Sequence, residues 1–320
     1  MEWWTLFKKK GGASLIINYF RTGALFPALI TFCVLGKSRK ALEILYLTAR
    51  FKIHRKLYNR YSKKIDDLLN KYRKDEHKYK RNIGERNIYV CWFQGMENAP
   101  DIIKKCYESL KKYINDRKIV LITEKNYRDY VNFPSHIEEK IEKGIISRTH
   151  MSDLLRLEIL TRYGGTWIDA TVLCTDTPPS YMLDSDLFVF QLLRPGLNGD
   201  TIGFSSWFIT SKPNHIILRA TLDVLYDYWY NYNTMLDYFL FHHIFELVKM
   251  KCMDEFSKII PFPNESPLLL GFKMFDEYDE TVWSVIKRQS PFHKLTYKFT
   301  DEDKIKTNTY FSKIMSDCKM

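Results

Sequence analysis

The chain has 320 residues, of which 45% are apolar and 15% aromatic, and its formal net charge is +11. This length and composition argue against global disorder and predict one main domain with an appendage. The six cysteines form no C-x-x-C pair and no cysteine–histidine cluster at zinc-ligand spacing, which argues against a zinc site and favours a reducing, cytosolic setting.

The positive charge belongs to the N-terminal segment. Residues 1–86 hold 21 Lys and Arg and 7 Asp and Glu, a net of +14, which leaves −3 for the rest of the chain. A basic region can bind nucleic acid, but no helix-turn-helix, zinc-finger or RNA-binding aromatic pattern accompanies it. We therefore expect a membrane surface, and no nucleic acid, as the partner of this segment.

Residues 13–35 are mostly apolar. Arg21 lies inside this run, Gly23 weakens a helix and Pro27 interrupts one, so the longest apolar stretch is short. A transmembrane helix needs about 20 consecutive apolar residues. The sequence therefore does not predict a clean spanning helix, and a secretory signal peptide is also not expected, because no small-residue cleavage site follows an early charged region.

A long amphipathic helix is predicted over 39–79, with apolar residues at spacings of three and four and Lys and Arg on the other faces. Six aromatic residues precede it: Trp3, Trp4, Phe7, Tyr19, Phe20 and Phe26. Aromatic and basic residues of this kind suit the headgroups of an anionic inner leaflet. One interpretation is peripheral membrane attachment through 1–86. The other is a helical appendage that packs against the main domain and exposes a basic face.

From residue 87 the pattern changes to that of an α/β domain. Strands are predicted at 88–93 and 118–122 with a helix over 101–113 between them, the order that gives a parallel sheet. Further strands are predicted at 166–170, 187–193 and 207–211, and further helices at 152–163, 214–230 and 235–251. We therefore divide the chain into a basic helical segment, 1–86, and an α/β domain, 87–320.

The predicted helix over 152–163 has signals at both ends, since Ser152 suits an N-cap and Gly164 suits the position after the last turn. Asp153 and Arg156 are three residues apart and share a face near the helix start. A carboxylate and a guanidinium in this arrangement can bind sugar hydroxyls. The alternative is a surface ion pair that favours the helix dipole.

The strand that follows this helix carries Asp169 to its carboxyl end. Ligands bind outside the carboxyl ends of the strands in open α/β sheets, so a carboxylate there is suitably placed. A divalent cation that bridges two phosphates takes one or two oxygen atoms from the protein, and Asp169 can supply one. The alternative is an aspartate that caps the strand end or begins a turn.

Residues 152–171, S-D-L-L-R-L-E-I-L-T-R-Y-G-G-T-W-I-D-A-T, resemble the donor-site segment of the capsular polysaccharide synthesis proteins related to glycosyltransferase family 32. They are more distantly similar to the large clostridial glucosylating toxins. The similarity extends upstream to 88–100 and downstream to 237–243 and 292–298. The resemblance implies a GT-A (Rossmann-like) fold, glycosyltransferase activity, a nucleotide-sugar donor such as a UDP-sugar, and a divalent cation, Mn²⁺ or Mg²⁺.

Applied to this sequence, the resemblance implies that Asp153 and Arg156 hold the donor sugar and that Asp169 contacts the cation and the diphosphate. Trp92, at the end of the first strand, would stack on the base; the alternative is a core tryptophan. Related enzymes often carry Asp-x-Asp, whereas this chain has Thr171 at the third position. Threonine is a neutral and weaker ligand, so metal dependence is open.

Other candidates lie later in the chain. Asp237 and His242 are expected on a helix rich in Tyr and Phe, where they can line an acceptor cleft. His243 points about 100° away from His242, so the two make a poor chelating pair, and a hydrogen-bonded core position is the alternative for each. Lys294 can neutralise a departing diphosphate, with a surface lysine as its alternative.

These expectations combine into one function: transfer of a hexose from a nucleotide-diphosphate sugar, such as a UDP-hexose, to a hydroxyl of a lipid-linked oligosaccharide in bacterial capsule or surface polysaccharide synthesis. The resemblance implies retention of anomeric configuration. The expected location is cytoplasmic, peripheral on the inner face of the cell membrane. One alternative is a toxin-like enzyme that glycosylates protein. The other is an inactive membrane-binding scaffold, and the best support for it is Thr171 at the third position of the motif.

Overall fold

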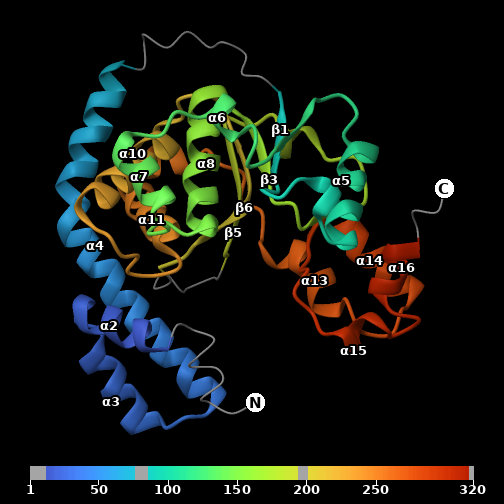
Figure 1. The fold of residues 1–320 in the computed structure, drawn as a ribbon, viewed down its shortest axis with the longest axis horizontal. Helices are drawn as coiled ribbons and strands as arrows, with labels where there is room; N and C mark the ends of the chain where they lie inside the picture. The colour runs from blue at the N-terminus through green and yellow to red at the C-terminus, as the bar shows by residue number, and fades with distance from the viewer. Residues whose placement is uncertain (1–11, 76–85, 194–200, 317–320) are drawn as a thin grey trace.

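The computed structural model describes residues 12–75, 86–193 and 201–316. The chain forms a five-stranded central sheet with helices on both faces, so the predicted α/β class is confirmed (Figure 1). In sheet order the strands are β2 (Ile119–Ile122), β1 (Ile88–Cys91), β3 (Gly165–Ile168), β6 (Phe204–Ser211) and β5 (Leu187–Gln191). A second sheet pairs β4 (Val172–Cys174) with β7 (Phe292–Lys294).

The central sheet is mixed. β1 runs parallel to β2 and to β3, as the strand–helix–strand order predicts. β6 is antiparallel to both of its neighbours, β3 and β5, so the prediction of a parallel sheet is wrong at this strand, whereas β5 runs in the same direction as β3. The reason is that β5 and β6 are neighbours both along the chain and in the sheet, which is the arrangement of an antiparallel hairpin.

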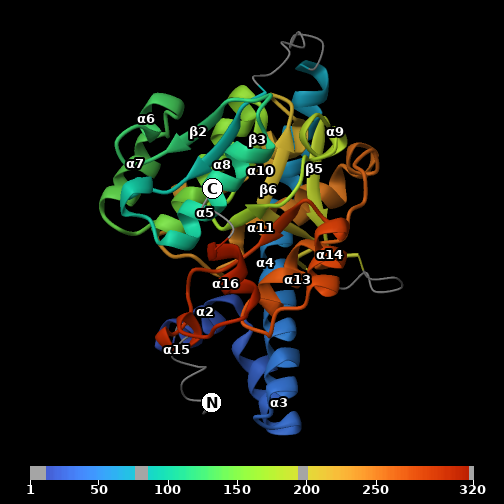
Figure 2. The same ribbon diagram turned by 90° about the vertical axis from the view of Figure 1, so that its right-hand side faces the viewer.

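Helices cover both faces of the sheet. One face carries α4 (Arg39–Asp75), α6 (Tyr127–Tyr130), α7 (Ser135–Glu142), α8 (Arg148–Tyr163), α10 (Ile216–Asn231) and α11 (Leu240–Lys251). The other carries α5 (Asp101–Tyr113), α9 (Ser180–Leu183), α13 (Glu265–Lys273), α14 (Glu280–Gln289) and α16 (Tyr310–Ser316). Short helices elsewhere are η2 (Met96–Asn98), α12 (Met253–Phe256) and α15 (Asp301–Lys304). Figure 2 shows α5, α14 and α16 on the near side of the strands and α4 on the far side.

The strands supply side chains to both layers. Tyr89 and Trp167 pack into the core formed with α8 and α10, whereas Ile88, Val90 and Ile168 pack into the core formed with α5. Successive side chains of a strand point to opposite faces, and here both faces are covered by helices. This explains why these strands are continuous apolar runs in the sequence.

The N-terminal segment begins with α2 (Ala13–Thr22) and α3 (Leu25–Leu35). The break between them falls at Gly23, which has a φ of 71°, and Pro27 is accommodated in the first turn of α3. Within the described part of the chain, no single helix is long and apolar enough to cross a membrane; α2 and α3 meet that test only as a pair bent by 114°. The aromatic residues Trp3, Trp4 and Phe7 and the predicted helical residues 76–79 lie outside the described ranges.

α4 is part of the main core. One stripe of this helix is buried in the cluster that also contains α10 and α11: Ile53, Leu57, Tyr61, Ile65, Leu69 and Tyr72. The basic segment therefore packs against the α/β domain, as one of its two interpretations requires. Its contact with a membrane, and the division of the chain at residue 86, stay predictions.

α8 begins earlier than the sequence predicts. Its N-cap is Ser147, whose hydroxyl accepts a hydrogen bond from the backbone N–H of His150 at 3.3 Å. Ser152 lies inside the helix, so the prediction that it is the N-cap is wrong. The helix ends at Tyr163 and is followed by Gly164 at a φ of 70°, as predicted.

Gly164→Ala is expected to lower the free energy of unfolding by at least about 2 kcal/mol. A Cβ there would lie 2.9 Å from the backbone nitrogen of Pro213 and 2.9 Å from the carbonyl oxygen of Ser211. Gly144 is the matched control, because its φ is 67° but nothing lies within 4 Å of an added Cβ. Urea unfolding measures both variants; equal losses for Gly164→Ala and Gly144→Ala would contradict the role of the close packing.

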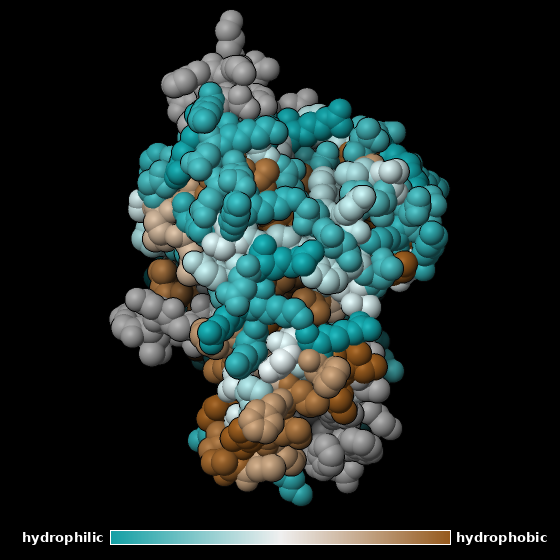
Figure 3. All heavy atoms as spheres, turned by 90° about the vertical axis from the view of Figure 1, so that its left-hand side faces the viewer, coloured by the Kyte–Doolittle hydropathy of each residue, from teal (hydrophilic) through white to brown (hydrophobic). Residues whose placement is uncertain are grey.

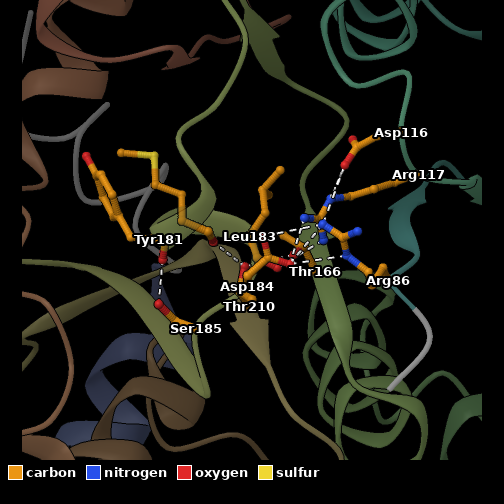
Figure 4. A network of polar contacts seen from close by, with 10 residues as sticks. Arg86, Asp116, Arg117, Thr166, Tyr181, Leu183, Asp184, Ser185 and Thr210 are labelled. Atoms are coloured by element: carbon orange, nitrogen blue, oxygen red, sulfur yellow. Dashed lines mark hydrogen bonds and ion pairs between the residues drawn. The ribbon is translucent and has the colours of Figure 1, made fainter. Parts of the chain in front are cut away.

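A polar network closes the end of the sheet at which the parallel strands begin (Figure 4). The buried guanidinium of Arg117 donates to the carbonyl oxygen of Leu183 at 3.1 Å and to the Asp184 carboxylate at 2.8 Å. Arg86 donates to the same carboxylate at 3.2 Å and reaches Asp116 at 3.5 Å. Burial opposes ionisation of Asp184, but the two arginines hold its pKa below the usual range. This network ties α9 to the chain before β1 and β2 and leaves the opposite end of the sheet for a ligand.

Four histidines whose pKa is lowered by burial or partial burial make the fold sensitive to acid. Burial lowers the pKa of His54 and His242 to about 4 and of His215 and His293 to about 3. In the unfolded chain a histidine titrates near about 6.5, so below that pH the unfolded state binds protons that the folded state does not. Their contribution to stability is complete above the unfolded pKa and is lost as the pH falls toward the folded pKa, at up to about 1.4 kcal/mol per histidine per pH unit.

The expected result is a urea midpoint that falls steeply between about pH 6.5 and about pH 4. His215→Gln should reduce that slope, because one proton-binding difference is removed. A midpoint that stays constant over this range would contradict the neutral state of these side chains.

Candidate functional site

Asp169 lies directly after β3, at the carboxyl end of the strand, as predicted. Its backbone N–H donates to the carbonyl oxygen of Trp207 at 2.8 Å, and its carboxylate accepts from the indole N–H of Trp167 at 3.0 Å. The carboxylate also accepts from Lys294 Nζ at 2.8 Å. Burial alone would raise the pKa of Asp169, but Lys294 and Arg156 hold it below the usual range. Asp169 is therefore an ionised carboxylate between two cations.

Lys294 reaches the site through the second sheet. In the β4–β7 pair Val172 lies opposite Lys294, which brings the lysine beside residues 169–171. Its ammonium donates to the Thr171 hydroxyl as well as to Asp169. The alternative of a surface lysine is wrong, because the side chain is half-buried and paired with both groups.

Arg156 joins the two acidic side chains of the site. Its NH2 lies 3.3 Å from Asp153 Oδ1 and 3.5 Å from Asp169 Oδ1. The guanidinium also donates to the backbone oxygen and hydroxyl of Ser152, at 3.2 and 3.1 Å, and to the carbonyl oxygen of Ser206. Arg156 is 5% and Asp153 7% exposed, so the alternative of a surface ion pair is wrong. A buried charged group requires a partner of opposite charge, and Arg156 and Asp153 each have one.

One histidine contacts Asp153, and the charge of Asp153 acts on a second. Nδ1 of the buried His150 lies 3.3 Å from Asp153 Oδ2, three residues back along α8. The sequence analysis missed His150 because it began the helix at residue 152; a helix that begins at 148 puts His150 on the face of Asp153. His242 is influenced by the charges of Asp153 and Arg156, and burial keeps its imidazole neutral near neutral pH. Of the two acceptor candidates, His242 is the one whose pKa responds to the charges of Asp153 and Arg156.

Asp237 is turned to a different neighbour. It precedes α11, so its expected place on that helix is wrong. Its carboxylate accepts from the backbone N–H of Phe239 at 2.7 Å and lies 3.9 Å from Nε2 of the buried His243. The ring of His243 lies 5.6 Å from that of His54 on α4. The adjacent histidines thus face different surroundings, and Asp237 belongs to the contact with the N-terminal helices.

Aromatic side chains form the edge of the site. Trp92 follows β1 and packs edge-on against Tyr297, with ring centroids 5.3 Å apart. It is half-buried, and its indole N–H has no hydrogen-bond partner among the described residues. Tyr238 is largely exposed. Its pKa is raised, first by partial burial and then by the negative charges of Asp153 and Asp169. The sequence analysis did not single out Tyr238 and Tyr297, although both lie in segments to which the resemblance extends, 237–243 and 292–298.

The residues of the site can supply only part of a metal shell. Among the described residues, no three His, Cys, Asp or Glu side chains are grouped so that they could hold a metal ion. Asp169 and Thr171 offer two oxygen atoms, the number that Mg²⁺ takes from proteins when phosphates and water supply the rest. Both oxygen atoms accept hydrogen bonds from Lys294, so a cation can bind them only if this ammonium moves.

The chain is similar to known proteins over most of its length. A family model described as capsular polysaccharide synthesis protein matches residues 42–314. The chain is 24% identical over 165 residues to the O-glycosyltransferase PaGT of Phomopsis amygdali, an alignment that covers 45% of this chain and 39% of that protein. It thus spans less than half the length of this curated relative.

Among solved structures, the PaToxG glycosyltransferase aligns with a TM-score of 0.37 and 16% identity, over 83% of this chain and 97% of that chain. A TM-score this low does not establish a shared fold. The family match is stronger, because it includes the helix and strand that carry Asp153, Arg156 and Asp169 and also reaches Lys294. The resemblance seen in residues 152–171 is confirmed: the chain belongs to the capsular polysaccharide synthesis protein family.

Proposed function

We propose that the chain is a glycosyltransferase of the GT-A type that uses a nucleotide-diphosphate sugar, with a UDP-hexose as the expected donor. The observation that carries the proposal is the group of two carboxylates and two cations at the carboxyl end of β3, formed by Asp153, Arg156, Asp169 and Lys294. The curated relative that is named as an O-glycosyltransferase supports it. The family's role in capsule synthesis indicates a saccharide as the acceptor.

The charges of the site match the two halves of such a donor. Asp153 accepts hydrogen bonds from sugar hydroxyls, and Arg156 donates to them from a fixed position. Arg156 and Lys294 stabilise the negative charge that develops on the diphosphate as the sugar–oxygen bond breaks. Trp92 offers its ring to the base of the nucleotide.

A divalent cation, Mn²⁺ or Mg²⁺, is part of the proposal. Asp169 would be its carboxylate ligand and Thr171 a neutral one, after Lys294 turns from these oxygen atoms toward the diphosphate. The cation would supply further neutralisation of the diphosphate. Asp169 and Thr171 can therefore bind a divalent cation only when Lys294 binds the diphosphate instead of their oxygen atoms.

Transfer is proposed to retain the anomeric configuration. Among the described residues of the site, the carboxylates of Asp153 and Asp169 are already paired with Arg156 or Lys294. Neither carboxylate is therefore suited to act as a general base. The leaving phosphate oxygen then takes the proton of the acceptor hydroxyl. NMR of the product is expected to show an α-linkage from an α-linked donor, and a β-linked product would contradict this.

The acceptor is proposed to be a hydroxyl of a lipid-linked oligosaccharide at the inner, cytoplasmic face of the cell membrane. The positive charge of residues 1–86 suits an anionic membrane surface. The charges of Asp153 and Arg156 act on His242, whose imidazole burial keeps neutral, and it is therefore the acceptor-side candidate that we favour.

The first experiment is a thermal-shift screen with UDP-glucose, UDP-galactose and their N-acetyl forms, with and without Mn²⁺. A true donor raises the melting temperature by mass action once its concentration is well above its Kd. Lys294→Met should remove most of that rise, because one of the two cations for the diphosphate is lost. The absence of any shift across the panel, together with no hydrolysis of UDP-sugars, would favour an inactive scaffold instead.

A further inference from the structure

An apolar surface covers α2 and α3, at the end of the molecule away from α13 and α15 (Figures 1 and 3). Nine large apolar side chains of these helices are exposed: Ile16, Ile17, Phe20, Phe26, Leu29, Ile30, Phe32, Val34 and Leu35. The surface continues on α4 through Ile44, Leu47 and Phe51. Contiguous apolar patches of this kind mark an interaction site on a protein surface. We call α2 and α3 together the hairpin.

The backbone groups at the break of the hairpin and the hydroxyl of α3 are paired within it. At the break, the N–H groups of Gly23 and Ala24 donate to the carbonyl oxygens of Phe20 and Tyr19 at 3.1 and 2.8 Å. The hydroxyl of Thr31 donates to the carbonyl oxygen of Pro27 at 2.9 Å, and α3 contains no charged residue. Hydrocarbon tolerates backbone and hydroxyl groups only when they are paired in this way.

The polar side chains of α2 point to the rest of the protein. Asn18 donates to the carbonyl oxygen of Met235 at 3.1 Å, and Arg21 donates to the Thr234 hydroxyl at 3.0 Å. Ile16, on the other side of the helix, is exposed. The hairpin therefore has one polar face toward residues 234–235 and one apolar face toward the solvent.

Dimensions favour insertion into one leaflet over a spanning arrangement. The 11 residues of α3 are about 16 Å long, roughly half of a hydrocarbon core of about 30 Å. The bend of 114° returns α3 toward the side from which α2 comes. Amphipathic helices that lie in the interface bury their apolar face to a depth of about 5–10 Å, which these helices can reach.

The positive charge of neighbouring residues indicates what binds to this apolar surface. Lys37, Arg39 and Lys40 follow α3 directly, and Arg55 and Lys56 lie further along α4; all are exposed. Anionic headgroups attract such residues. A second copy of the chain would bring the same basic residues together on both sides of the contact, and like charges oppose that contact. An anionic bilayer satisfies both the apolar surface and the charge.

The hairpin also supports the segment that borders the donor site. Asn18 and Arg21 of α2 hold residues 234–235. Next to the hairpin, on α4, the guanidinium of Arg50 lies 4.5 Å from the ring centroid of Phe239. Between these contacts lies Tyr238. The hydroxyl of Tyr228 donates to the carbonyl oxygen of Thr234 at 2.6 Å, and the adjacent Trp229 packs against His150 of the site with ring centroids 5.4 Å apart. A protein held by the hairpin would thus present residues 234–239 and the donor site next to the bilayer.

We infer that the hairpin inserts into one leaflet of an anionic bilayer, and that residues 234–239 form the acceptor side of the site, close to the membrane surface. The second half of this inference rests on the proposed function, since it assigns the lipid-linked acceptor to that segment. The first half stands on the exposed apolar residues and the basic residues alone.

Sedimentation with vesicles tests the insertion. The test variant is Phe26→Glu with Val34→Glu, at positions that are 73% and 74% exposed. The matched control is Phe272→Glu with Ile305→Glu, at positions 80% and 78% exposed on α13 and after α15. With vesicles of phosphatidylcholine and phosphatidylglycerol in equal parts, the test variant should bind at least about tenfold more weakly than the wild type and the control.

Equal binding by both variants, or no binding by the wild type, would overturn the insertion. Light scattering without lipid gives the competing result: a wild-type dimer that the test variant converts to a monomer would assign the surface to a second copy of the chain. Binding lost in high salt with the test variant behaving as wild type would assign membrane contact to the basic residues alone.

Activity tests the assignment of residues 234–239. The test variant should hydrolyse the donor at the wild-type rate but lose at least about tenfold in transfer to a lipid-linked acceptor in vesicles, because it is absent from the surface. Unchanged transfer would overturn the assignment. If the wild type hydrolyses no donor, the proposed function fails while the vesicle result still decides the insertion.

Discussion

Asp169→Asn should lower kcat for sugar transfer by at least about 1,000-fold. The carboxylate is the only group that meets Lys294, Arg156 and the indole of Trp167 together in the described site. An amide has the same shape but lacks the charge that orders the two cations and that would hold a divalent ion. The loss should fall on kcat more than on KM for the donor, because Arg156 and Lys294 still attract the diphosphate.

Steady-state kinetics with the donor found in the thermal-shift screen measure this effect. Asp176→Asn is the matched control: it is the same substitution at an exposed aspartate close in the chain, whose carboxylate accepts only from the Thr177 backbone N–H among the described bonds. That variant should keep wild-type activity. Circular dichroism verifies that Asp169→Asn is folded, and a kcat within tenfold of the wild type would exclude the role proposed for this carboxylate.

Arg156→Met should destabilise the protein by about 3–5 kcal/mol, the largest stability effect expected in the site. The substitution removes the positive charge between the buried carboxylate of Asp153 and the half-buried carboxylate of Asp169, and leaves the carbonyl oxygen of Ser206 without this donor. Arg156→Lys keeps a charge but cannot donate in several directions from one plane. We expect it to fold and to lose about 100-fold in kcat.

Arg162→Met is the control for the stability measurement. Arg162 lies in the last turn of the same helix and is exposed, so its replacement should cost less than about 1 kcal/mol. Urea unfolding gives both values. If Arg156→Met is as stable as Arg162→Met, the guanidinium does not hold the two carboxylates together.

Several elements follow from local sequence signals. The helix predicted over 101–113 has the same bounds in the structure, because Pro100 precedes its first turn and its apolar residues repeat at helical spacing. The strand ends at 88–91 and 119–122 are within two residues of the predictions. These features depend on neighbours a few residues apart, and periodicity records such neighbours directly.

Two helix starts were misplaced, one because of core packing and one because of a local hydrogen bond. Ser147 and Ser152 are equally good caps in the sequence, and the choice between them depends on the burial of His150 and Met151 in the core. α11 begins at Leu240 rather than at residue 235, since Asp237 accepts from the N–H of Phe239 before the helix starts. A cap is a local signal, but tertiary packing decides which of two local signals is used.

The amino-acid sequence alone was sufficient to predict that Asp153, Arg156 and Asp169 lie together, because one helix and the strand after it carry all three at short spacings. It was sufficient for the family as well. Lys294 was found only as a weak candidate, since its place beside Asp169 depends on the register of β4 and β7, which are more than a hundred residues apart along the chain.

Long-range packing also determined the roles of His150, Tyr238 and the hairpin. The pairing of Asp153 with Arg156 reads in the sequence as an ordinary surface pair, and becomes a buried bridge only because β3 and β6 pack over it. In the same way, the apolar run of residues 13–35 does not reveal which side chains stay exposed. Spacing along a chain encodes local geometry, whereas burial and exposure are properties of the whole folded molecule.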